Sequence, residues 1–70
     1  MPQKTYLYNN DYVAIEFERL PTPISFPFPH IGRDGVKWTA LSLIKDSEFQ
    51  LPNGFDSEKT ILFRYDGAIA

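Results

Sequence analysis

Four prolines fall within nine residues near the middle of the chain, at Pro21, Pro23, Pro27 and Pro29. Each proline fixes its own φ angle and lacks a backbone N–H, so neither a helix nor an interior strand can pass through this segment. We therefore expect residues 20–32 to be extended, in the polyproline II conformation. The segment also carries four large apolar side chains that need cover, Ile24, Phe26, Phe28 and Ile31. It is predicted to close one end of a barrel as a lid, or else to form a docking surface for a partner.

The residues before the prolines alternate between apolar and polar side chains. Within residues 12–18, Val13, Ile15 and Phe17 fall on one face, and two glutamates fall on the other. This period of two, built from β-branched and aromatic residues, is typical of a half-buried strand. A shorter apolar run precedes it at residues 4–8, and the Asn-Asn-Asp triplet between the two runs suits a tight turn. The first part of the chain is thus predicted to form a β-hairpin.

Residues 36–45 fit two kinds of element. As a strand, they place Val36, Trp38, Ala40 and Ile44 on one face and two leucines on the other. As a helix, they would begin at an Asp34 cap and place Trp38 in a stripe with later residues. Valine, tryptophan and threonine at the front of the run favour the strand.

Two further strands are predicted at residues 48–51 and 60–65, followed by a turn at Asp66-Gly67. Five short strands in 70 residues indicate a single all-β domain spanning residues 1–70. The expected architecture is a small antiparallel five-stranded sheet or a partly open barrel, of the size of SH3-like or OB-like domains. If residues 36–46 are helical instead, the class becomes α+β with one short helix.

The residues that usually carry chemistry are sparse. Cysteine is absent and His30 is the one histidine, so neither a metal site nor a catalytic base for the serines and threonines is expected. Glu16 and Glu18 share one face of a predicted strand, where carboxylates are usually solvated. We therefore expect no catalytic residues, no cofactor and no metal, and we do not expect an enzyme.

The charge balance bears on partners and compartment. Seven basic residues are spread along the chain against nine acidic ones, which gives a net charge of −2. Nucleic-acid binders usually show a basic face, so this balance disfavours nucleic acid as the partner. The chain shows neither a long apolar run nor a signal-peptide pattern, so a cytoplasmic protein that does not contact membranes is expected.

Aromatic side chains make up 16% of the residues and are the most informative feature. Tyrosine, tryptophan and arginine are common anchors of protein interfaces. The sequence therefore predicts a small protein-binding module that acts as an adaptor or an inhibitor. Its small size, and not these residues, is what it shares with the short adaptors and inhibitors that phages and mobile elements encode. Edge-strand pairing through residues 4–8 or 60–65 would also allow a homodimer. The predicted partner-binding residues are Tyr6, Tyr8, Tyr12, Phe26, Phe28, His30 and Arg33.

One stretch supports an alternative. Residues 26–38 combine Phe-Pro-Phe-Pro with Gly32, Gly35 and Trp38. This run resembles the proline-turn wing of phage excisionase-type winged-helix proteins, in which it precedes a short helix. That family binds DNA, so the resemblance implies a nucleic-acid-binding small barrel or a degenerate winged helix. In the family a recognition helix comes before the run, whereas here a predicted hairpin does, and protein binding remains the leading hypothesis.

Overall fold

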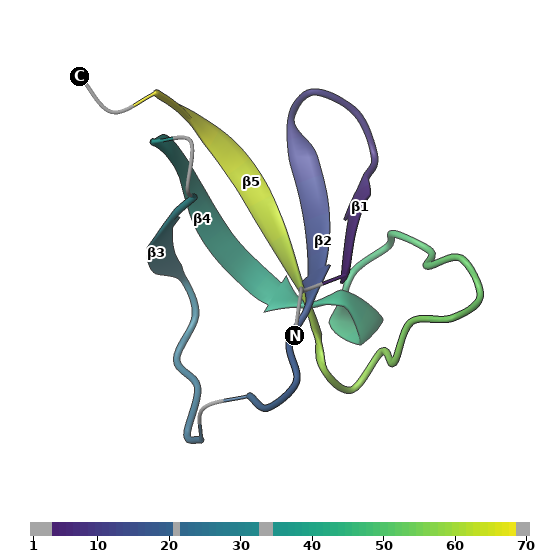
Figure 1. The fold of residues 1–70 in the computed structure, drawn as a ribbon. Coiled ribbons are helices and arrows are strands. Elements are labelled where there is room, and N and C mark those ends of the chain that lie inside the picture. The colour runs from purple at the N-terminus through teal and green to yellow at the C-terminus, as the bar shows by residue number, and fades with distance from the viewer. Residues whose placement is uncertain (1–3, 21, 33–34, 69–70) are drawn as a thin grey trace.

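The protein folds as one antiparallel sheet of five strands, in the spatial order β1-β2-β5-β4-β3 (Figure 1). This computed structural model describes residues 4–20, 22–32 and 35–68. A single 3₁₀ turn, η1 (Ile44–Asp46), follows β4. The all-β prediction is confirmed, and the sheet is open. The strands are β1 (Lys4–Leu7), β2 (Tyr12–Glu16), β3 (Phe28–Ile31), β4 (Val36–Leu43) and β5 (Thr60–Ala68).

The last strand, β5, lies in the middle of the sheet and pairs with β2 on one side and β4 on the other. Its first four residues, Thr60, Ile61, Leu62 and Phe63, are each at most 3% exposed. Both edges of β5 are therefore occupied by neighbouring strands. The prediction that residues 60–65 could pair with a partner as an edge strand is wrong for this reason.

Both faces of the sheet carry a small core. We call one the proline face, because the proline-rich segment between β2 and β3 covers it through Phe17, Leu20, Ile24 and Phe26, together with Phe28 at the start of β3. The other we call the tyrosine face, because Tyr8 and Tyr12 pack there with Phe49 and Leu51 of the loop before β5. The predicted lid thus covers a face of an open sheet instead of the end of a barrel. The buried residues are Val13, Ile15, Ala40, Ile61 and Phe63 on the proline face and Ala14, Ile44 and Leu62 on the tyrosine face.

The fifth strand comes from the proline-rich segment, which was expected to contain none. Phe28–Ile31 pairs with β4 at the outer edge of the sheet. The Gly32 N–H donates to the Val36 carbonyl (2.9 Å), so by the alternation of an antiparallel ladder His30 also faces β4 and Pro29 faces outward. A missing N–H on the outer edge costs no ladder bond, and proline is tolerated there.

Residues 48–51 form no strand, although their alternation predicted one. Phe49 and Leu51 both pack onto the tyrosine face from a loop, which gives the same period of two without strand pairing. The alternation in this segment therefore indicates which side chains face the sheet, and it does not indicate backbone pairing with another strand.

Residues 36–43 are a strand, and the helical alternative for residues 36–46 is wrong apart from the 3₁₀ turn at its end. A register shift between Ala40 and Ser42 leaves Leu41 without an opposing residue in β5. Such a bulge exchanges the faces of the residues that follow it. Leu43 therefore joins Trp38 and Ala40 on the proline face, while Ile44 moves to the tyrosine face, contrary to the predicted grouping.

A second register shift lies in β5, where Asp66 is skipped between Tyr65 and Gly67. Residues 66–67 were predicted to be a turn, but the strand continues through them to Ala68. Gly67 has a φ of +106°, a region that residues with a Cβ rarely adopt. The turn signal in the sequence therefore marks a bulge.

Phe63→Ala is expected to leave the chain largely unfolded. Phe63 is 0% exposed, and replacing a buried phenylalanine by alanine costs about 3–5 kcal/mol, which is comparable to the whole stability of a domain of this size. Circular dichroism and urea titration measure the effect. Ile31→Ala, at a side chain that is 61% exposed, should unfold at nearly the same urea concentration as the original chain. A folded Phe63→Ala variant would contradict the central position of β5.

Gly67→Ala tests the bulge in β5. An added Cβ would meet no atom within 4 Å, so the cost should come from the positive φ alone, about 1–2 kcal/mol. Lys37→Ala, opposite Gly67 in the register, should change the free energy of unfolding by no more than about 0.5 kcal/mol. Equal urea midpoints for the two variants would show that the backbone at position 67 relaxes without strain.

Candidate functional site

The predicted tyrosine site is mostly internal packing. The rings of Tyr8 and Tyr12 lie 4.6 and 5.1 Å from the Phe49 ring, centroid to centroid. The Tyr8 hydroxyl donates to the Gln50 carbonyl at 3.0 Å. Burial, and then the neighbouring Tyr6, raise the pKa of the Tyr8 phenol above its usual value. Tyr6 contacts Tyr8 edge to face at 5.0 Å and is 40% exposed, so it presents the most accessible ring of the three.

The remaining predicted site residues lie on or near the proline face. Phe26 and Phe28 stack at 5.6 Å, and Phe28 meets the buried Phe63 ring edge to face at 6.3 Å. Both phenylalanines are half-buried and help to cover the core. His30 lies with its ring 5.2 Å from that of Phe63. Arg33 is outside the described residues.

The structure brings together three aromatic side chains whose proximity the sequence analysis did not predict. His30 of β3 lies opposite Trp38 of β4, and Trp38 lies opposite Tyr65 of β5. The Trp38 and Tyr65 rings meet edge to face at 5.4 Å. Tyr65 is 40% exposed and the other two are half-buried. We call these three residues the aromatic row. Two of its members lie outside the predicted set, because their proximity depends on strand register, which no local pattern specifies.

A polar network holds the same strands from the opposite face. Side chains alternate along a strand, so Thr39 and Arg64 point away from the aromatic row. The Thr39 hydroxyl donates to Asp66, and Arg64 Nε lies 3.1 Å from the other carboxylate oxygen of Asp66. The Thr39 hydrogen bond, followed by that of Arg64, lowers the pKa of Asp66 below its usual value. The network thus fixes β4 and β5 at the bulge next to the row.

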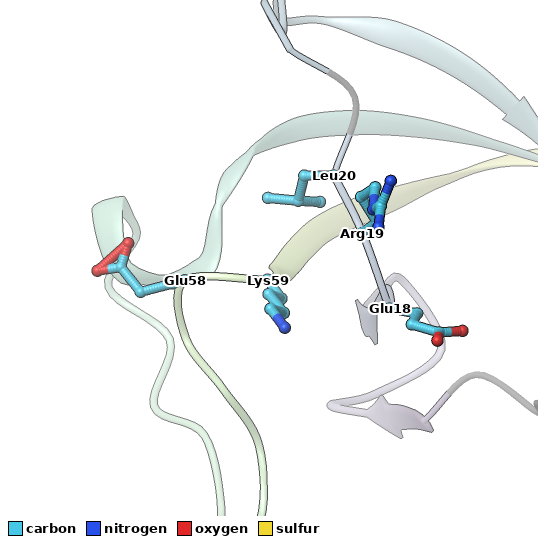
Figure 2. Close-up of a pocket in the computed structure, with 5 residues that line it drawn as sticks. All are labelled: Glu18, Arg19, Leu20, Glu58 and Lys59. Carbon is cyan, nitrogen blue, oxygen red and sulfur yellow. The ribbon is translucent and has the colours of Figure 1, made fainter.

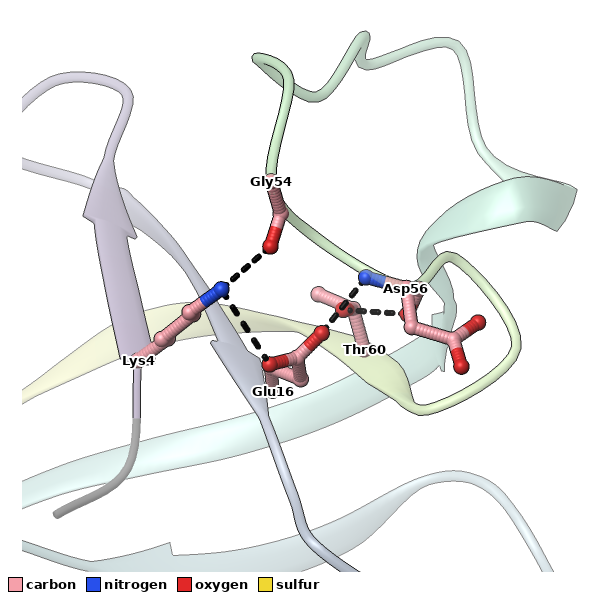
Figure 3. Close-up of polar contacts among 5 residues, drawn as sticks. All are labelled: Lys4, Glu16, Gly54, Asp56 and Thr60. Atoms are coloured by element: carbon pink, nitrogen blue, oxygen red, sulfur yellow. Dashed lines mark hydrogen bonds and ion pairs between the residues drawn. The ribbon is translucent and has the colours of Figure 1, made fainter.

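A second polar network ties the long loop before β5 to the sheet (Figure 3). Lys4 donates to the Gly54 carbonyl and lies 4.0 Å from a Glu16 carboxylate oxygen. The other Glu16 oxygen accepts the Asp56 N–H, and the Thr60 hydroxyl donates to the Asp56 carbonyl at 2.8 Å. These bonds connect the loop to β1, β2 and β5, so they hold Phe49 and Leu51 against the tyrosine face.

One pocket of about 800 Å³ opens beside the end of β2 (Figure 2). Two carboxylates and two cationic side chains line it, so its charges balance. Glu58 is engaged by Lys45 at 2.7 Å, and Leu20 packs against the core of the proline face. Its lining has acids and bases but no histidine or hydroxyl nucleophile. The lining residues are Glu18, Arg19, Leu20, Glu58 and Lys59.

Comparisons with known proteins return nothing: no family model, no curated protein and no solved structure matches the chain. Among residues 4–20, 22–32 and 35–68, no group of three or more histidine, cysteine, aspartate or glutamate side chains could hold a metal ion. The described part of the chain also contains no helix long and apolar enough to span a membrane.

Asp66→Asn should reduce the acid sensitivity of the fold. The pKa of Asp66 is lowered in the folded state, so this carboxylate contributes stability above its unfolded pKa and loses it as the pH falls through the folded value. The loss is expected below about pH 4. Urea midpoints measured at neutral pH and at about pH 3 should therefore differ less for Asp66→Asn than for the original chain.

The control is Glu48→Gln, at an exposed carboxylate outside the network. It should keep the original pH dependence. If the urea midpoints of Asp66→Asn and Glu48→Gln fell by the same amount between neutral pH and about pH 3, the result would contradict a stabilising role for the Thr39–Asp66–Arg64 contacts.

Proposed function

We propose that the protein is a small, non-catalytic, cytoplasmic module that binds another protein through the aromatic row, as an adaptor or an inhibitor. The observation that carries the proposal is the exposure of Tyr65 in edge-to-face contact with Trp38, beside the core of the proline face. On the same face Leu7 of β1 is also exposed, but it lies opposite Val13 on the far side of the sheet and has no aromatic neighbour in the row.

The row has the properties of an interface anchor. Tyrosine and tryptophan bury a large area for few rotatable bonds and are enriched at binding hot spots. Here both rings are carried by paired strands and touch each other at 5.4 Å. The polar network behind them holds the strands in register. Little side-chain freedom would therefore be lost on binding, which favours affinity.

The charges near the row favour a protein over a nucleic acid. The nearest cations in sequence, Lys37 and Arg64, each precede a member of the row by one position, so they fall on the opposite face of the sheet. The chain as a whole carries a net charge of −2. A stacking platform for single-stranded nucleic acid combines aromatic rings with a positive groove. Within the aromatic row itself, His30 is the one side chain that can carry a positive charge. The run resembling a wing forms β3 and the start of β4, with no recognition helix among the described residues before it.

Capture from a lysate of the source organism tests this proposal. The immobilised protein should retain a protein in near-equal amount after nuclease treatment, and Tyr65→Ala should retain at least about tenfold less, as expected for a hot-spot residue. Ile31→Ala is the matched control, because Ile31 is an exposed apolar side chain on β3 that points away from the row. Circular dichroism confirms that each variant is folded.

Three results would contradict the proposal. These are equal capture by Tyr65→Ala and the original chain, equal loss with Ile31→Ala, and retention of nucleic acid that nuclease removes. The last result, with a steep dependence on salt, would instead support the nucleic-acid alternative.

A further inference from the structure

The two outer edges of the sheet differ in their capacity to accept another strand. At one edge, the outward position Pro29 in β3 has no N–H to donate. At the other edge, within the described residues, β1 pairs with β2 alone. Figure 1 shows β1 and β3 at opposite ends of the sheet. One edge is therefore blocked by proline and the other is open.

The backbone groups of β1 that face outward can be identified. The Tyr8 N–H donates to the Tyr12 carbonyl at 3.1 Å. Inward and outward groups alternate along an antiparallel strand, so Lys4 and Tyr6 bond to β2, while Thr5 and Leu7 direct their N–H and carbonyl groups away from it. Four backbone hydrogen-bonding groups thus lie on the outer edge, symmetrically placed about Tyr6.

The side chains of β1 do little to discourage pairing. All four are exposed, and Tyr6 and Leu7 are 40% and 60% exposed. Edge strands are commonly protected by a lysine that projects into solvent. Here the Lys4 ammonium is held by the Gly54 carbonyl and Glu16 (Figure 3). It also lies 5.6 Å from the centre of the Phe55 ring.

We propose that a second copy of this chain pairs with β1 in antiparallel orientation, about a two-fold axis that passes beside Tyr6. In this register Thr5 of each copy faces Leu7 of the other, and each such pair forms two backbone hydrogen bonds, four in all. Tyr6 faces its own counterpart. The two five-stranded sheets become one continuous sheet with both aromatic rows on the same face.

Self-pairing is favoured over a foreign strand because the edge is complementary to itself. Lys4 faces Tyr8 of the second copy, so no two like charges face each other directly across the seam. The two Lys4 residues then lie four positions apart along the seam, about 13 Å, beyond the Debye length of roughly 10 Å at ordinary salt. An isologous contact also closes after two copies, because it uses the open edge of each.

Sedimentation equilibrium tests the pairing, with Thr5→Pro and Thr5→Ala as a matched pair. Thr5→Pro removes an outward N–H and leaves the bonds to β2 in place, whereas Thr5→Ala keeps the N–H. Over about 10 μM to 1 mM, a range suited to a small interface, the original chain and Thr5→Ala should approach twice the 8.1 kDa monomer mass. Thr5→Pro, shown by circular dichroism to be folded, should stay at the monomer mass.

A disulfide test fixes the register without relying on proline. The chain has no cysteine, so Tyr6→Cys places one thiol per copy at the proposed axis. The Cα atoms of such a facing pair are about 4.5 Å apart, within disulfide range. Tyr6→Cys should oxidise readily to a covalent dimer, whereas Ile31→Cys, at a more exposed position of the proline-blocked edge, should not.

The proposal is overturned if the original chain stays monomeric throughout, if the dimer survives Thr5→Pro unchanged, or if the two cysteine variants oxidise equally. A monomer whose captured protein is lost on Thr5→Pro would show that β1 accepts a foreign strand instead. The outcome is independent of the proposed function, since Tyr65→Ala should leave the dimer intact and Thr5→Pro should leave the aromatic row intact.

Discussion

The structure depends on the double pairing of β5. Its segment Thr60–Phe63 is buried on both faces and hydrogen-bonded along both edges. Ile61 and Phe63 supply the core of the proline face, and Leu62 supplies that of the tyrosine face. A sheet of five strands can be this thoroughly buried only if something covers each side of it. In this chain the segment between β2 and β3 covers the proline face, and the loop between η1 and β5 covers the tyrosine face.

The strands whose formation depends on a short run of residues could be predicted from the sequence. The hairpin of β1 and β2, the strand character of residues 36–43 and the start of β5 all follow from alternation over a few residues. Strand β3 was missed because proline argues against an interior strand, and only the long-range order of strands places Phe28–Ile31 at an edge. The bulge at Leu41 was missed for a related reason, since a register shift is a property of two strands and not of one.

The candidate site shows the same division. Aromatic composition drew attention to the rings as candidate binding residues, but the sequence does not distinguish a half-buried tyrosine from an exposed one. Tyr8 and Tyr12 are covered by Phe49, which lies more than thirty positions later in the chain. Trp38 and Tyr65 meet through strand register. Exposure and proximity therefore depended on contacts between distant segments, which one sequence without relatives does not reveal.

The central position of β5 also bears on how the chain folds as it is made. The strands on either side of β5 come from two separate parts of the chain, β1 with β2 and β4 with β3, and β5 follows both of them. During synthesis each pair leaves the ribosome with an unpaired edge and an uncovered apolar side, because the strand that joins them has not yet been made. A two-stranded unit is only marginally stable in water. The sheet can therefore be completed only after β5 has been made, because neither strand pair is a stable unit before β5 joins them.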